Sequence, residues 1–332
     1  MVDLLKSLIL KMLSVPEFDE KNLHPVVVIL GPTAVGKTEI ALKLAGNLNG
    51  EIISADSRLF YRGMDIGTAK PSKQELERVP HHLVDIADPD EGISLSIFQN
   101  LARQAIQEVR ERDRLPFLVG GTGQYIRSVI EDWEVPRVEP SPALRDILED
   151  WAKVIGPEGL HKRLSVLDPR AAEGIDYRNL RRTIRALEVI LLTGKLFSSQ
   201  KRRGRSLYHT LQLGLNRSRS ELYERIDRRV DSMIEAGLID EVRTLLEKGY
   251  PGNLPSLSAI GYREIIAYLE DQISLEEAIR LVKRSTRILV RRQANWFKDR
   301  DPNIRWFRAG TSVANSMEDE IKAWLIQLDR LV

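Results

Sequence analysis

Short apolar runs alternate with helical patterns along most of the chain. Residues 26–30 are β-branched or aliphatic throughout, which is typical of a strand buried on both faces. Similar runs occur at residues 51–55, 116–119 and 210–215, separated by longer segments whose apolar positions recur every three or four residues. Strands that alternate with helices in this way predict an α/β fold, in which a parallel sheet is flanked by helices.

The pattern changes after Asp132, where prolines mark a linker and the apolar positions take a helical spacing. We expect residues 133–206 to form a helical insertion domain inside an α/β core built from residues 25–132 and 207–332. The last third of the chain has a helical pattern as well. Residues 1–24 are interpreted as an N-terminal extension that contains a short amphipathic helix.

Composition narrows the possible classes of protein. The 332 residues are 42% hydrophobic and 30% charged, as in an ordinary globular protein. The formal net charge is only +2, so any nucleic-acid function must depend on where the basic residues cluster. The chain has no cysteine, which excludes disulfides, thiolate zinc sites and a cysteine nucleophile. Neither a signal peptide nor an apolar run of bilayer length is recognisable. We therefore expect a cytoplasmic monomer without a membrane partner.

One glycine-rich motif lies between the first strand and a helical pattern. It has the form G-x-x-x-x-G-K-[ST], whose glycines let backbone N–H groups converge on phosphate oxygens at a helix N-terminus. Its lysine would reach the terminal phosphate, and the hydroxyl of its last residue would hold Mg²⁺. The motif consists of Gly31, Pro32, Thr33, Ala34, Val35, Gly36, Lys37 and Thr38. The flanking strand and helix favour a di- or triphosphate site over an ordinary glycine turn.

The ends of the second and third strands indicate what else surrounds the phosphates. Asp56 follows the second strand and should lie beside them, because ligands of open α/β sheets bind at the carboxyl ends of the strands. Its carboxylate could hold Mg²⁺, accept a proton from the substrate or cap the next element. The third strand ends in Gly120-Gly121-Thr122-Gly123, without the acid found there in ATP-hydrolysing phosphate-loop proteins. These glycines suggest a backbone that approaches a ligand closely, as in group transfer to a bulky acceptor.

Three further features are less specific. Residues 61–71 are rich in glycine and small polar side chains, which predicts a lid or the wall of a groove. Residues 81–86 are interpreted as a short strand whose two histidines are structural rather than metal ligands. Arg219 begins the helix after the fourth strand, where it could clamp a phosphate or form a surface salt bridge.

Basic residues cluster in two helical regions. In the insertion domain, Arg181, Arg182 and Arg185 lie off an apolar face that includes Leu191, and few acids accompany them, which favours a polyanion over a solvated face. A stripe with spacings of four, three and four consists of Arg280, Arg284, Arg287 and Arg291. Residues 291–298 then interleave aromatic side chains with cations, which suits the bases and phosphates of RNA. A nucleic-acid acceptor is therefore favoured over a metabolite.

Taken in order, these motifs resemble the tRNA dimethylallyltransferases, also called tRNA isopentenyltransferases. The resemblance rests on the phosphate loop, Ser54-Ala55-Asp56-Ser57, residues 61–71, His81-His82-Leu83, Gly120-Gly121-Thr122-Gly123, Arg185-Ala186-Leu187-Glu188-Val189, Ala259-Ile260-Gly261-Tyr262-Arg263-Glu264 and Arg291-Arg292-Gln293. It extends from about residue 25 to residue 300. Residues 63–71 are especially specific, because general phosphate-loop kinases have no counterpart. The absence of cysteine indicates the bacterial form, since eukaryotic relatives carry a C-terminal zinc finger.

The resemblance implies a reaction and its site. A dimethylallyl group would pass from dimethylallyl diphosphate, with Mg²⁺, to N6 of the adenosine just 3′ of the anticodon (position 37) in tRNAs that read codons beginning with U. Residues 33–38 would hold the diphosphate, Arg219 would help it leave, Asp56 would be the general base and Thr122 would contact the target nucleotide. The insertion domain would grip the anticodon stem-loop. The implied tRNA contacts are Asp56, Ser57, Arg58, Leu59, Thr122, Arg181, Arg182, Arg185, Ser258, Gly261, Tyr262, Arg263, Arg291, Arg292, Gln293, Trp296 and Lys298.

Two alternatives share parts of this pattern. An isopentenyltransferase that acts on free AMP or ATP would have the catalytic half but would need neither the insertion nor the basic C-terminal helix. An RNA-binding phosphate-loop NTPase should carry an acid at the end of the third strand. The sequence also departs from residues common in the family at Arg58-Leu59-Phe60, Ile93 and Gln124, which concerns the contacts of the base pocket rather than the reaction.

Overall fold

The computed structural model describes residues 24–136, 138–200, 204 and 206–330, which form two compact units. The first unit contains residues 24–93, Ile97–Ile130 and residues 207–330. The second contains Ser94–Ser96 and the described residues of Glu131–Ser206. The predicted N-terminal amphipathic helix lies outside the described residues.

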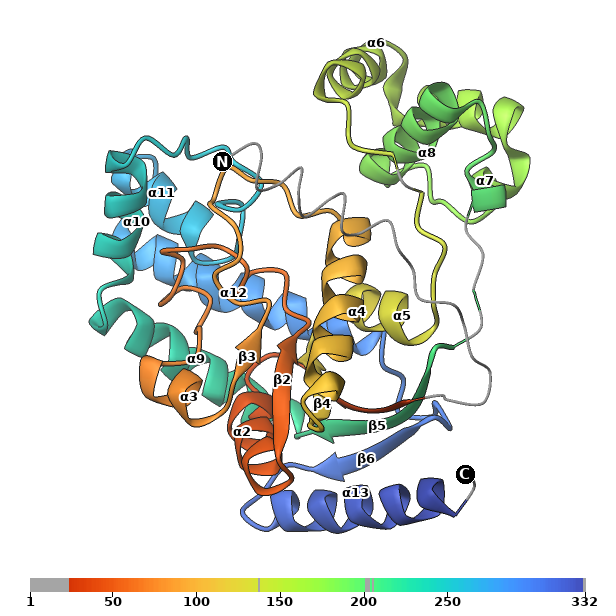
Figure 1. Ribbon diagram of the computed structural model, residues 1–332. Coiled ribbons are helices and arrows are strands. Elements are labelled where there is room, and N and C mark those ends of the chain that lie inside the picture. Colours follow the sequence, from red (N-terminus) through yellow and green to blue (C-terminus); the bar gives the residue numbers. More distant parts are fainter. Residues whose placement is uncertain (1–23, 137, 201–203, 205, 331–332) are drawn as a thin grey trace. The chain divides into compact units, whose positions relative to one another are not determined.

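A parallel sheet of six strands forms the centre of the first unit (Figure 1). The strands are β1 (His24–Leu30), β2 (Gly50–Ser54), β3 (His81–His82), β4 (Leu115–Gly120), β5 (Tyr208–Asn216) and β6 (Ile304–Arg308). Their order across the sheet is β3-β2-β4-β1-β5-β6, and each neighbouring pair is parallel. The predicted α/β fold with a parallel sheet is confirmed.

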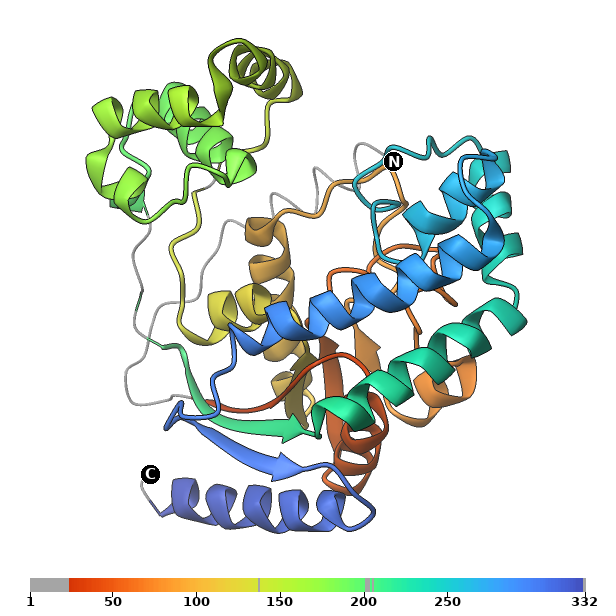
Figure 2. The same ribbon diagram turned by 180° about the vertical axis from the view of Figure 1, so that it is seen from behind.

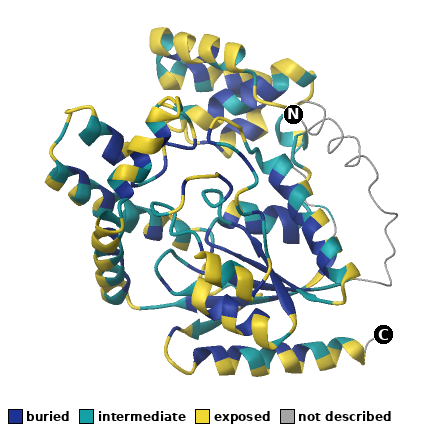
Figure 3. Ribbon diagram, turned by 60° about the vertical axis from the view of Figure 1, so that its left-hand side comes forward, coloured by how far each residue is buried: buried dark blue, intermediate teal, exposed yellow. Residues whose placement is uncertain are grey.

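Apolar side chains cover the sheet on both faces, as the unbroken aliphatic run of β1 predicted. Val27 and Ile29 join one core cluster with Leu211, Leu213 and Phe117, which are their neighbours on β5 and β4. The alternate residues of β1, Val26, Val28 and Leu30, point to the other face and are equally buried. The strands accordingly form the buried centre in Figure 3.

Helices flank this sheet. They are α2 (Lys37–Asn47), α3 (Lys73–Arg78), α4 (Leu95–Glu111), α5 (Gly123–Ile130), α9 (Arg219–Glu235), α10 (Leu238–Glu247), α11 (Tyr262–Leu269), α12 (Leu275–Ala294) and α13 (Val313–Asp329). Helices α9 and α12 contact each other and lie behind the sheet in the view of Figure 1, so they come to the front in Figure 2. Ser218 caps α9: its hydroxyl accepts the N–H of Glu221, whose carboxylate accepts the N–H of Ser218.

The second unit is helical. It contains α6 (Pro142–Leu167), α7 (Pro169–Glu173), α8 (Leu180–Thr193) and a short 3₁₀ turn, η1 (Ser198–Gln200). Helix α6 is kinked where Gly156 takes a φ of 74° directly before Pro157. The hydrophobic core of the second unit includes Leu160 of α6 and Leu187 of α8. Leu191, predicted for the same apolar face of α8, is instead 56% exposed, because the core ends one turn earlier.

Two features of the fold differ from expectation. The strand expected at residues 81–86 ends at His82, because Leu83 and Asp85 take positive φ values of 62° and 53°. Strand β6 was not predicted, since Arg305 and Arg308 leave no continuous apolar run. Among the described residues, no helix is both long enough and apolar enough to cross a membrane.

Candidate active site

The carboxyl ends of four neighbouring strands meet at one edge of the sheet. Leu30 of β1 pairs with Gly120 of β4 and with Gly214 of β5, and Ser54 of β2 pairs with Val119 of β4. Because all four strands are parallel, the segments that follow them leave the sheet together. These segments are the phosphate loop, Asp56, the glycine-rich turn after β4 and the start of α9.

The phosphate loop has the backbone that its glycines permit. Gly36 takes a φ of 106°, and a Cβ atom at Gly31 would lie 2.6 Å from the carbonyl oxygen of Leu215. The Lys37 ammonium donates hydrogen bonds to the carbonyl oxygens of Gly31 (3.0 Å) and Pro32 (2.8 Å). Burial lowers the pKa of Lys37 to about 8, against the opposing effect of the Asp56 carboxylate. The ammonium therefore lies across its own loop, beside a carboxylate.

Arginines just before α9 and within it lie near this loop. Arg217 donates to the carbonyl oxygen of Val35 (3.0 Å), and Arg225 donates to that of Ala34 (2.7 Å). Arg229, one turn after Arg225, is half-buried near Asp56, and its removal from water lowers its pKa. The predicted clamp, Arg219, is exposed on the first turn of the helix, so its role in diphosphate departure stays a prediction.

Sequence reasoning missed Arg217, Arg225 and Arg229. A signal for two of them is present in the sequence: arginines spaced by four lie on one face of a helix, and this helix starts where β5 ends. The pairing of β5 with β1, which places that helix beside the loop, cannot be read from the spacing alone.

The position of Asp56 left three roles open: Mg²⁺ binding, proton acceptance and capping of the next element. The structure shows the capping role. One carboxylate oxygen accepts the N–H of Arg58 at 3.0 Å, which closes a turn directly after β2. Asp56 is half-buried, and its charge acts on both Lys37 and Arg229. Capping with one oxygen is compatible with proton transfer or Mg²⁺ binding, so those two roles stay open.

The glycines after β4 lie directly against other parts of the protein. At Gly120 an added Cβ atom would lie 2.4 Å from the Ala55 carbonyl oxygen. At Gly121 it would lie 2.5 Å from the Gln293 amide nitrogen, and at Gly123 it would lie 2.4 Å from the Trp296 Cβ atom. Other parts of the protein therefore occupy the space where a side chain would lie at all three positions, and the close approach of this backbone to a ligand stays a prediction. Thr122, between them, is half-buried, and its carbonyl oxygen accepts the first N–H bonds of α5.

Gln293 joins this turn to the phosphate loop. Its side-chain oxygen accepts the N–H of Thr33 at 2.8 Å, and its nitrogen donates to the carbonyl oxygen of Gly121 at 3.1 Å. The resemblance implied a tRNA contact for Gln293, whereas its amide group is used inside the protein. A neutral amide can supply both a donor and an acceptor, which a charged side chain cannot do.

The C-terminal end of α12 and the residues that follow it carry the exposed cations that were predicted to face RNA. Arg291, Arg292 and Lys298 are exposed, and Trp296 is half-buried. The basic stripe on the preceding turns is partly neutralised: Arg280 pairs with Glu277, and Arg287 pairs with Asp227. Uncompensated positive charge is therefore concentrated toward the end of the helix.

Some of the residues predicted to contact tRNA in the segment 258–263 lie on the surface, and others lie in the core. Ser258 and Arg263 are exposed, but Gly261 and Tyr262 are buried. The Tyr262 side chain is fully buried and its hydroxyl donates to Glu241 at 2.6 Å, so the predicted tRNA contact by Tyr262 is wrong. Its aromatic ring fills core volume, which the sequence motif did not indicate.

The segment after Asp56 is also held within the protein. Arg58 donates to the carbonyl oxygens of Pro255 (3.0 Å) and Ser256 (3.1 Å). Ser57 and Leu59 are half-buried. Arg58 therefore fixes the loop that precedes Ser258, and a direct tRNA contact by these three residues stays a prediction.

In the second unit, the three predicted arginines of α8 have different environments. Arg181 and Arg182 are exposed. Arg185 donates to the carboxylate of Glu188 and to the carbonyl oxygen of Val138 (2.9 Å). Burial would raise the pKa of Glu188, but hydrogen bonds from Arg145 and Arg185 outweigh it and lower the pKa. Arg185 is thus compensated by a buried acid, and Arg181 and Arg182 remain the candidates for a polyanion.

Known proteins share this sequence and fold. A family model described as IPP transferase matches residues 59–300. The chain is 51% identical over 288 residues to the tRNA dimethylallyltransferase of Roseiflexus sp. (strain RS-1), covering 87% of this chain and 94% of that protein. It is 50% identical over 284 residues to the tRNA dimethylallyltransferase of Desulforudis audaxviator (strain MP104C), covering 85% and 91%.

Solved structures agree. The full-length tRNA isopentenylpyrophosphate transferase from Bacillus halodurans is similar with a TM-score of 0.70 and 43% identity, covering 93% of this chain and 99% of that one. A eukaryotic dimethylallyltransferase acting on tRNA is similar with a TM-score of 0.75 and 28% identity, covering 93% and 79%. The resemblance drawn from the sequence motifs is confirmed, and the chain belongs to the IPP transferase family.

Proposed function

We propose that the protein transfers a dimethylallyl group from dimethylallyl diphosphate to N6 of an adenosine in tRNA, releasing diphosphate. Relatives of about 50% identity that bear the name tRNA dimethylallyltransferase support this activity. The observation that carries it structurally is that Lys37 and Arg229 lie near Asp56 at one edge of the sheet, while Arg225 is held on the adjoining phosphate loop. Cations grouped near one carboxylate suit a reaction that expels an anion and removes a proton.

The cations act on the donor. An allylic diphosphate ionises once the charge that develops on its leaving group is stabilised, and preorganised cations in a partly buried site do this effectively. Lys37 and Arg225 now donate to loop carbonyls, and these hydrogen bonds can be exchanged for bonds to diphosphate oxygens. Backbone N–H groups of residues 33–38, at the N-terminus of α2, add further donors.

The carboxylate acts on the acceptor. An exocyclic amine is a weak nucleophile, so Asp56 would accept the N6 proton as the new carbon–nitrogen bond forms. The adenosine must leave the stacked anticodon loop to reach the donor. Thr122, at the end of the neighbouring strand, would contact the base once it has entered the site.

A Mg²⁺ ion fits the donor set of this site. Among the described residues, no group of three or more acidic or histidine side chains is placed to hold a metal. Mg²⁺ in phosphate sites is usually held by one or two protein oxygens and by the substrate phosphates, so a full protein cage is not required. The exposed Thr38 hydroxyl at the start of α2, with Asp56 as a second candidate, would supply the protein oxygens. The ion would neutralise charge on the diphosphate.

The acceptor is proposed to be the adenosine just 3′ of the anticodon in tRNAs that read codons beginning with U. The exposed cations Arg181, Arg182, Arg291, Arg292 and Lys298 would pair with phosphates of the anticodon stem-loop. Ser258 and Arg263 are the exposed members of the third predicted contact segment. We propose that the protein works as a monomer in the cytoplasm.

The deciding experiment compares three acceptors for labelled dimethylallyl diphosphate in the presence of Mg²⁺. They are an anticodon stem-loop with adenosine after the anticodon, the same stem-loop with that adenosine replaced, and free AMP. We expect label only in the first. Label in AMP alone would identify an enzyme of free nucleotides. No label in any acceptor, together with steady ATP turnover, would identify an RNA-binding NTPase.

A further inference from the structure

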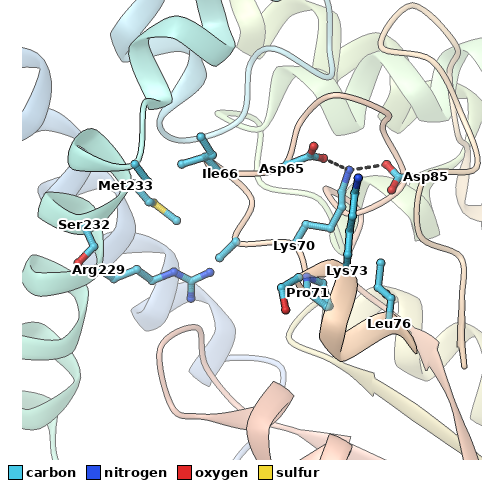
Figure 4. Close-up of a pocket in the computed structure, with 13 residues that line it drawn as sticks. Asp65, Ile66, Lys70, Pro71, Lys73, Leu76, Asp85, Arg229, Ser232 and Met233 are labelled. Carbon is cyan, nitrogen blue, oxygen red and sulfur yellow. Dashed lines mark hydrogen bonds and ion pairs between the residues drawn. The ribbon is translucent and has the colours of Figure 1, made fainter. Parts of the chain in front are cut away.

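The segment after Phe60 forms a self-contained loop around a buried lysine. Lys70, whose side chain is 4% exposed, donates to the Tyr61 carbonyl oxygen at 2.8 Å and to the carboxylates of Asp65 and Asp85 at 2.5 Å each (Figure 4). Backbone bonds from Ala69 to Ile66 and from Lys70 to Asp65 close the turn. The shape of the predicted lid or groove wall is therefore fixed by hydrogen bonds within the protein.

This loop forms one wall of a cavity of about 490 Å³. Ile66 and Pro71 line the cavity from the loop, and Arg229 and Met233 line it from α9. In Figure 4 the Arg229 side chain extends from α9 toward the loop. Since Arg229 also lies near Asp56 and Lys37, the cavity adjoins the proposed diphosphate site. Its lining combines the cations Arg229 and Lys73 with apolar groups, which suits an allylic diphosphate, and its two carboxylates are paired with Lys70.

A single carboxylate from α10 holds the loop in place. One oxygen of Glu241 accepts the N–H groups of Asp65 (2.9 Å) and Ile66 (2.7 Å). The other oxygen accepts the N–H of Gly67 (3.2 Å) and the hydroxyl of Tyr262 (2.6 Å). Three successive backbone donors and one hydroxyl thus converge on one side chain, and hydrogen bonds to an ionised group are among the stronger ones.

The Tyr262 ring makes this arrangement tight. A Cβ atom at Gly67 would lie 2.4 Å from the ring, so only glycine fits there. Burial, together with the nearby charge of Glu241 and the hydrogen bond to it, raises the pKa of Tyr262, which keeps the hydroxyl protonated as a donor. Glu241 and Tyr262 together leave the turn at Asp65–Gly67 little freedom to move away from α10.

We propose that Glu241 is a positioning residue for the prenyl donor, because it fixes the turn at Asp65–Gly67 and thereby the distance between the cavity wall and Arg229. The proposal rests on the proposed function and adds a residue to it. Glu241 touches neither substrate: it acts through the backbone of the loop. Its substitution should therefore affect binding of the donor and not binding of the tRNA.

The test compares three variants of the whole chain. Glu241→Gln retains the size of the side chain but leaves one acceptor oxygen where the loop and Tyr262 present four donors. Tyr262→Phe removes one donor and keeps the ring against Gly67. Glu247→Gln, an exposed position in the last turn of the same helix, is the matched control. For each, KM is measured separately for dimethylallyl diphosphate and for the tRNA stem-loop, with kcat and the thermal midpoint.

For Glu241→Gln we expect the donor KM to rise about tenfold, as the loss of charged hydrogen bonds predicts. The tRNA KM should stay within about twofold, and kcat at saturating donor within about threefold. Tyr262→Phe should give a smaller change of the same kind, and Glu247→Gln none. If Glu241→Gln does not yield folded protein, Tyr262→Phe carries the same comparison of the two KM values.

A lower thermal midpoint with both KM values unchanged would show that Glu241 is only structural, and equal increases in both KM values would show that it does not act on the donor side specifically. Either result overturns the proposal while the transfer activity of the unmodified protein stands. Absence of transfer in the unmodified protein would instead contradict the proposed function.

Discussion

The cations at the sheet edge and those on α12 are held in different ways. Lys37, Arg217 and Arg225 donate to backbone carbonyl oxygens of the phosphate loop, which are neutral and leave the positive charge available. On α12, Arg287 is bound to the carboxylate of Asp227, whereas Arg291 is exposed. A cation held by carbonyls is positioned for an anion, a cation paired with a carboxylate is structural, and an exposed cation is screened by salt.

The largest expected effect comes from the Asp56 carboxylate, which lies near Lys37 and Arg229. Asp56→Ala should lower kcat by about a thousandfold or more, because a positioned general base contributes about two to four orders of magnitude. Affinity for the tRNA stem-loop should stay within a few-fold, since the base acts mainly in the transition state. Single-turnover transfer and filter binding measure the two quantities. Full activity in the variant would remove Asp56 from the mechanism.

The next effect separates two arginines of α9. Arg225→Met should lower kcat/KM for the donor about a hundredfold, because it removes a positioned cation from the leaving group. Arg219→Met, on the exposed first turn of the same helix, should change it by less than about threefold. Inhibition by inorganic diphosphate should weaken in the first variant only. The opposite ranking would support the predicted role of Arg219 as the clamp.

Salt dependence distinguishes exposed from paired cations. Neutralising Arg291, Arg292 and Lys298 together should reduce the slope of log tRNA affinity against log salt concentration by about two. Each phosphate contact on a single strand contributes about 0.7 to this slope. Arg287→Ala should leave that slope unchanged and lower stability, because it strands the Asp227 carboxylate. An unchanged slope in the triple variant would place the RNA on another surface.

The smallest expected effect is a pH dependence of donor binding. The pKa of Lys37, lowered to about 8 by burial, should rise when a diphosphate binds beside the ammonium. Above pH 8 the Lys37 ammonium then stays protonated in the complex, whereas the free protein loses this proton. The contribution of the Lys37 charge to donor binding is complete below pH 8. It is lost as the pH rises from 8 toward the pKa that Lys37 has in the complex. The donor KM should therefore be about tenfold higher at pH 9 than at pH 7. Lys37→Arg should abolish this rise, and a rise that persists would assign it to another group.

The sequence predicted most of what depends on local pattern. The aliphatic run of β1, the glycines of the phosphate loop and the position of Asp56 after β2 are all local, and the structure places them at one edge of the sheet. Residues whose role depends on distant partners were assigned less well. The packing of Gln293 against Gly121 was not predicted, because the sequence does not show which segments pack together.

Two further assignments show the same limit. Tyr262 belongs to a motif that resembles a tRNA contact, but its burial against Gly67 and Glu241 can be seen only in the fold. Arg185 looked uncompensated among arginines, yet the one nearby acid, Glu188, is buried beside it. A count of charges along the chain could not assign that acid to a particular arginine.

The hydrogen bond between Gln293 and Thr33 joins residues 260 positions apart in the chain. During synthesis the phosphate loop leaves the ribosome long before α12 is made. The Thr33 N–H can therefore bind the Gln293 side chain only after α12 has also emerged. Contacts of such long range form late, after the ordering of many intervening residues. A chain that stops before α12 would therefore carry the phosphate-binding motif without the hydrogen bonds from Gln293. The donor site would be complete only after α12 has been synthesised.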